Sequence, residues 1–121
     1  MDKATLVKRL KESFLQKKSS GLVIDAIGLV PAYHGLVENR YTLGVSAPSL
    51  IGMHIHEKIG LIIGLLFESL TLEERTFIDR VRVFNNVEEL ESAKENEFEE
   101  YPYEGYDSYA RAPKAELYEV G

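Results

Sequence analysis

Length, composition and charge limit what this chain can be. It has 121 residues, of which 45% are hydrophobic, and a formal net charge of −6 at pH 7, so it is large enough for one domain with a buried core. The sequence has no cysteine, which excludes disulfides, thiolate metal ligands and cysteine nucleophiles, and its charged N-terminus lacks the apolar segment of a signal peptide, so we expect a cytoplasmic protein.

The net charge is concentrated at the C-terminal end. Residues 1–94 contain 12 acidic and 12 basic side chains, whereas residues 95–121 contain eight acidic and two basic ones. An acidic segment repels phosphate backbones, so nucleic acid is not the expected partner. This division predicts an α+β domain at 1–94, followed by an acidic, tyrosine-rich C-terminal tail at 95–121.

The N-terminal part of the chain predicts one helix and two strands. Residues 3–16 place apolar side chains at helical spacing, with a basic opposite side. Residues 22–30 are almost wholly apolar and rich in β-branched side chains, which is typical of a strand covered on both faces. Residues 40–45 read as a second strand in which Tyr41, Leu43 and Val45 share one face. The connection at 31–39 makes these strands an antiparallel hairpin with a wide loop.

The longest apolar run, IGLIIGLLF at 59–67, lies in a central helix predicted at 49–70. This helix is apolar nearly all round, so we expect it to be either buried or covered on two sides. Charged residues bound the run, which is shorter than the roughly 20 residues of a membrane span, so no span is expected. Gly60 and Gly64 mark a strip where another backbone can approach closely, either from the sheet or from a symmetry mate.

The remaining elements follow from capping and alternation. Residues 71–77 begin with a capping box and predict a short helix. Residues 79–84 alternate as a third strand with Val81 and Val83 toward the core, and residues 86–94 begin with another helix-capping pattern. The order α-β-β-α-α-β-α predicts a small α+β two-layer sandwich. We expect a three-stranded sheet with helices on one face and an extended C-terminal tail.

The histidines His34, His54 and His56 are the candidate metal ligands. His54 and His56 share a side only if the backbone between them is extended, because on a helix they point about 200° apart. A surface position without metal is the alternative, since zinc sites normally gather three or four ligands. The sequence has no nucleophile elbow, P-loop or dinucleotide-binding motif, so it predicts no cofactor and gives little support to an enzyme.

The tail is unusual because disordered segments are normally poor in aromatic residues. Tyrosine is enriched where protein surfaces meet. Two interpretations stay open: a flexible solubilising tail, and a tail that docks on its own domain or on a partner. The candidate partner-binding residues are Phe98, Tyr101, Tyr103, Tyr106, Tyr109 and Tyr118.

Two functions are compatible with these features. The first is a non-enzymatic protein-interaction or assembly protein, a subunit or adaptor, that uses an apolar helix or sheet surface and the tyrosine-rich tail. The alternative is a small-molecule or metal-binding domain that uses the histidines. The first strand and the central helix carry more apolar surface than a three-stranded domain readily covers, which favours a homo-oligomer or a stable complex with another protein.

Overall fold

The computed structural model describes residues 3–32, 39–93 and 116–120. These residues form an α+β fold, as the sequence predicts. The α-helices and strands in chain order are α1 (Lys3–Lys17), β1 (Ala26–Pro31), β2 (Tyr41–Ser46), α2 (Ile55–Ser69), α3 (Leu72–Arg75), β3 (Ile78–Phe84), α4 (Val87–Ala93) and β4 (Glu116–Glu119). Short 3-10 turns follow α1 (η1, Lys18–Ser20) and precede α2 (η3, Pro48–Leu50).

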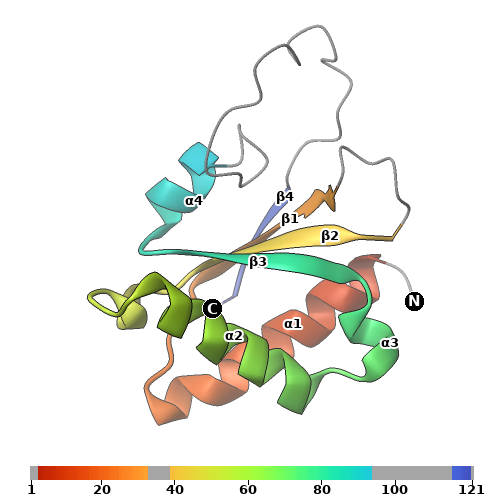
Figure 1. Cartoon of the computed structure of the whole chain (residues 1–121), viewed down its shortest axis with the longest axis horizontal. Helices are drawn as coiled ribbons and strands as arrows, with labels where there is room; N and C mark the ends of the chain where they lie inside the picture. Colours follow the sequence, from red (N-terminus) through yellow and green to blue (C-terminus); the bar gives the residue numbers. More distant parts are fainter. Residues whose placement is uncertain (1–2, 33–38, 94–115, 121) are drawn as a thin grey trace, which may run out of the picture.

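The sheet is mixed, with the strand order β3-β2-β1-β4 (Figure 1). β1 pairs antiparallel with β2, which confirms the predicted hairpin, and β2 pairs in parallel with β3. The predicted count of three strands is wrong, because the last residues of the chain add β4 antiparallel to β1. Beyond that strand, the backbone N–H of Val120 donates to the carbonyl oxygen of Asp25 at 3.0 Å. β4 thus covers an edge of β1 that would otherwise be unpaired.

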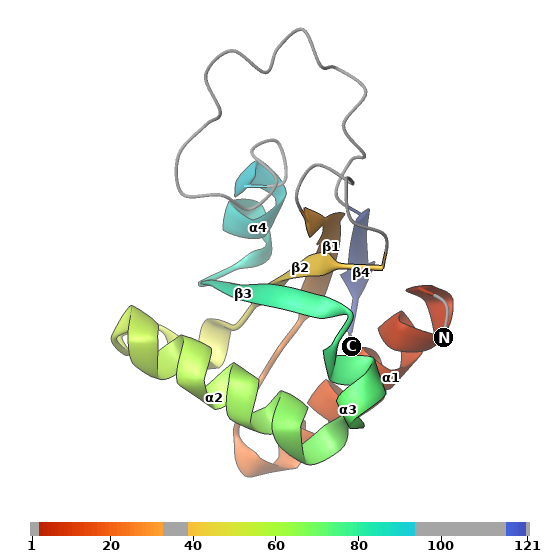
Figure 2. The same ribbon diagram turned by 45° about the vertical axis from the view of Figure 1, so that its right-hand side comes forward.

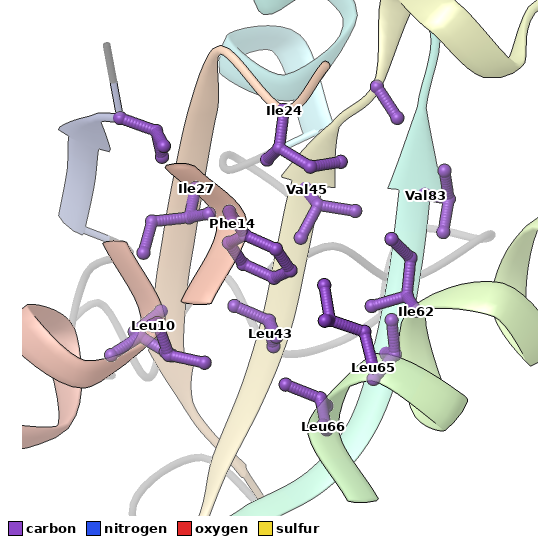
Figure 3. Packing of buried hydrophobic residues seen from close by; sticks show 14 of the residues in the cluster. Leu10, Phe14, Ile24, Ile27, Leu43, Val45, Ile62, Leu65, Leu66 and Val83 are labelled. Carbon is purple, nitrogen blue, oxygen red and sulfur yellow. The ribbon is translucent and has the colours of Figure 1, made fainter. Parts of the chain in front are cut away.

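The main core lies between the sheet and helices α1 and α2 (Figures 1 and 2). Leu43 and Val45 of β2 and Val83 of β3 point to this side, and Phe14 of α1 lies beside the two β2 side chains (Figure 3). Alternation along β2 and β3 therefore places the predicted residues in the core.

The opposite face of the sheet has its own, smaller apolar cluster. Leu90 of α4 is fully buried there against Ala26 and Val30 of β1. The prediction that the helices share one face is therefore wrong for α4, which lies across the sheet from α1 and α2 (Figure 2). The cause is β1 itself, which is apolar on both faces and needs a cover on each.

The largest differences from the predicted boundaries are at the starts of β1 and α2. β1 begins at Ala26 rather than at residue 22, and α2 begins at Ile55 rather than at residue 49. The chain before α2 forms a 3-10 turn and then passes through Gly52, whose φ of 94° is the left-handed conformation that favours glycine. A helix cannot continue through that residue, so α2 starts after it.

Candidate functional site

Helix α2 begins at a histidine cap. His54 has an extended backbone, and its Nδ1 accepts a hydrogen bond from the backbone N–H of His56 at 3.2 Å. This bond satisfies one of the amide groups that the first turn of a helix leaves unpaired. Glu57, in the first turn, is the favourable charge for that end of the helix dipole. These residues fix where α2 starts.

The inner side of α2 is anchored in the main core. Ile62, Leu65 and Leu66 are at most 5% exposed and point toward the strands (Figure 3). Lys58 is also buried on this side, and its Nζ donates to Oδ1 of Asn85 at 2.7 Å. Since a buried ammonium requires a hydrogen-bond partner, this bond helps hold the first turn of α2 against the end of β3.

The side of α2 that points away from the sheet is apolar and open to solvent, and we call it the outer face. Exposure is 47% at Leu61, 39% at Ile63 and 62% at Phe67. A Cβ placed on Gly60 or Gly64 would meet nothing within 4 Å. The outer face consists of His56, Glu57, Gly60, Leu61, Ile63, Gly64, Phe67 and Glu68.

An arginine completes the C-terminal end of the outer face. The guanidinium carbon of Arg75 lies 4.4 Å from the centre of the Phe67 ring, within the range of a cation–π contact. The Nη1 of Arg75 donates to the carbonyl oxygens of Phe67 at 3.2 Å and Leu70 at 3.1 Å. The exposed aromatic ring is thus held in a defined position.

The corner between α2 and α3 places Arg75 there. Oγ1 of Thr71 accepts the backbone N–H of Glu74, and Oε1 of Glu74 accepts the backbone N–H of Thr71, which confirms the predicted capping box. Oε2 of Glu74 also accepts Nε of Arg9 on α1 at 3.0 Å. The hydrogen bond from the Thr71 backbone, and then the Arg9 guanidinium, lower the pKa of Glu74 below its ordinary value, against the effect of burial.

The candidate metal ligands are only partly described. The rings of His54 and His56 lie side by side with centroids 5.0 Å apart and tilted by 32°, because His54 is extended and outside the helix. His34 lies outside the described residues. In the described part of the chain, no group of three or more histidine, aspartate or glutamate side chains is placed to hold a metal ion.

Of the candidate tail residues, only Tyr118 is described. It lies in β4 against the main core, its hydroxyl donates to Oε2 of Glu116 at 2.6 Å, and Nζ of Lys11 lies 5.6 Å from its ring centre. This last part of the tail docks on its own domain. The other candidates, Phe98, Tyr101, Tyr103, Tyr106 and Tyr109, lie outside the described residues.

Sequence reasoning selected His56 as a candidate metal ligand and marked Gly60 and Gly64 as a strip for close packing. It did not select Arg75, or Leu61, Ile63 and Phe67, as parts of a site. The apolar character of α2 on all sides was visible, but its sheet-facing side could not be told from its exposed side. The signal for Arg75 was its position directly after the capping box, which fixes the turn that carries it back over Phe67. No helix in the described residues is long and apolar enough to cross a bilayer.

Comparison with known proteins adds no assignment. No protein-family model, no curated protein and no solved structure matches this chain. The geometry of its own residues is therefore the basis for assigning a function.

Proposed function

We propose that this chain is a non-enzymatic protein-interaction or assembly protein, a subunit or adaptor, that binds a protein partner through the outer face of α2. The observation that carries the proposal is the joint exposure of Leu61, Ile63 and Phe67 beside two uncovered glycines on one helix. Contiguous apolar surface of this kind marks interaction sites more often than it marks ordinary surface.

The chemistry of the outer face suits protein binding. An exposed aromatic ring held by Arg75 is already ordered, so less side-chain entropy is lost on binding. Phenylalanine and arginine are both enriched in interfaces. The contribution of the tyrosine-rich tail to binding, and a cytoplasmic location, remain predictions.

The test compares two leucines of equal exposure. Leu61 on α2 is 47% exposed and Leu15 on α1 is 46% exposed, so Leu61→Glu and Leu15→Glu place the same charge on two helices. We expect Leu61→Glu alone to remove the association of the full chain with its partner, whether a second copy or another protein, measured by light scattering of the purified protein and of its isolated complex. Identical assemblies for both variants and the wild type would contradict the proposal.

The histidine pair favours a second candidate function, that of a small-molecule or metal-binding domain using His34, His54 and His56. Its support is the 5.0 Å separation of the His54 and His56 rings. The His54 Nδ1 already caps the helix, which leaves Nε2 as its free nitrogen. Elemental analysis of protein purified without a histidine tag, and thermal unfolding with added zinc, distinguish this function. Bound metal that is lost in His56→Ala would support it, and the absence of both metal and a thermal shift would remove it.

A further inference from the structure

Two lines of residues run along the outer face of α2, and only one of them contains carboxylates. Glu57, Leu61 and Glu68 are separated by four and seven residues, so they form one line, which we call the acidic flank. His56, Ile63 and Phe67 are separated by seven and four residues and form a second line on the other side of Gly60 and Gly64.

Arg75 adds its charge to the second line, because it stacks on Phe67. We call His56, Ile63, Phe67 and Arg75 the basic flank. On the acidic flank, Lys17 pairs with Glu68 at 3.2 Å but leaves the Glu68 side chain 67% exposed, so its carboxylate can accept another cation. The face therefore has a glycine strip in the middle, an acidic flank on one side and a basic flank on the other.

We infer that the partner bound by the outer face is a second copy of this chain, with the two α2 helices side by side and parallel about a two-fold axis. This inference rests on the proposed function and names the partner. A two-fold axis that runs parallel to both helices places the acidic flank of each copy against the basic flank of the other. Glu68 then meets Arg75 of the second copy at one end, and Glu57 meets its His56 at the other.

The antiparallel arrangement lacks this match. A two-fold axis across the helices keeps each flank on its own side, so Glu57 would face Glu68 of the other copy and Glu68 would not meet Arg75. Like charges in contact oppose association. The charge pattern therefore favours the parallel pair, in which the acidic flank of each copy lies against the basic flank of the other.

The glycines fit the same arrangement. Glycine in a helix interior is less favourable than alanine, and neither Gly60 nor Gly64 has a neighbour that a Cβ would touch. Small residues four apart let two helix backbones approach closely. In the parallel pair each glycine lies opposite its own copy, and Leu61 of one molecule lies beside Ile63 of the other.

Cysteine substitution tests the arrangement directly, because the natural chain has no cysteine. Since a Cβ at Gly60 or Gly64 meets nothing within 4 Å, we expect Gly60→Cys and Gly64→Cys to fold. Under mild oxidation, each variant alone should form a disulfide-linked dimer. Leu15→Cys, at a position of similar exposure to Leu61, is the control and should form no disulfide-linked dimer.

Sedimentation of the wild type provides the second arm of the test. We expect a dimer whose dissociation constant rises with salt, because the flanks attract through charge, and we expect Phe67→Ala to raise it about 30-fold, the effect of losing one interface hot spot. Disulfides that form only when Gly60→Cys and Gly64→Cys are mixed would overturn the parallel pair. A wild-type monomer at all concentrations would overturn self-association. If the wild type is a monomer and Leu61→Glu abolishes binding to a different protein, the proposed function stands without self-association. If Leu61→Glu changes no association at all, both self-association and the proposed function are wrong.

Discussion

Replacing Glu74 with alanine tests whether the α2–α3 corner is held as described. The side chain is 8% exposed and joins Thr71 in the capping box to Arg9 on α1. Loss of a helix cap costs about 1 kcal/mol, and loss of a hydrogen bond between charged groups costs about 1.5–3 kcal/mol. Because Arg9 is 41% exposed and water can replace the carboxylate, the lower part of that range applies. We expect Glu74→Ala to lower the free energy of unfolding by about 2–3 kcal/mol at pH 7.

Urea unfolding of the wild type, Glu74→Ala and Glu74→Gln measures this loss. The glutamine variant keeps an oxygen for the Thr71 N–H but has no charge for Arg9, so we expect an intermediate value. The folded-state pKa of Glu74 is lowered from 4.5, so the carboxylate contributes its full stability above pH 4.5. That stability is lost as the pH falls from 4.5 through the lowered pKa. A difference below about 0.5 kcal/mol at pH 7, the range of an ordinary surface substitution, would refute the reasoning, as would a difference that does not shrink on acidification.

Three further predictions concern the core, the glycine strip and β4. Ile62 is fully buried, so Ile62→Ala should cost about 2–5 kcal/mol in urea unfolding. Gly64→Ala should stabilise the monomer by up to about 1 kcal/mol, because its Cβ is unobstructed and alanine favours helix. The same change should weaken the dimer. Unfolding measured at low and at high protein concentration distinguishes these two effects. Burial, and then the hydrogen bond to Glu116, raise the pKa of Tyr118 from 10.0 to about 12. The contribution of this tyrosine to folding stability is therefore present below pH 10 and lost as the pH rises through about 12. Spectroscopic titration should show a late tyrosine component that disappears in Tyr118→Phe.

Local patterns predicted most of the elements. Alternation placed Leu43, Val45 and Val83 correctly in the core, because each strand has one face on the helices. The capping box at Thr71 located α3 for the same kind of reason, since its hydrogen bonds join residues only three apart. Information that is local in the sequence was sufficient in these cases.

Non-local pairing was not predictable in the same way. β4 is four residues long, includes two glutamates and pairs with β1 about ninety residues earlier, so neither length nor alternation indicates a strand. The candidate site had the same difficulty. The sequence indicated that Gly60 and Gly64 serve close packing but left the sheet and a symmetry mate as alternatives, and only the fold shows that the sheet lies on the other side of α2.

Methyl NMR of the unmodified full chain at a series of protein concentrations tests self-association through the outer face of α2 without any substitution. The methyl signals of Leu61 and Ile63 report on that face, and those of Leu15, equally exposed on α1, provide the internal control. Self-association should shift the Leu61 and Ile63 signals as concentration rises, while those of Leu15 stay constant. Signals that are independent of concentration at all three residues, or a shift confined to Leu15, would contradict it.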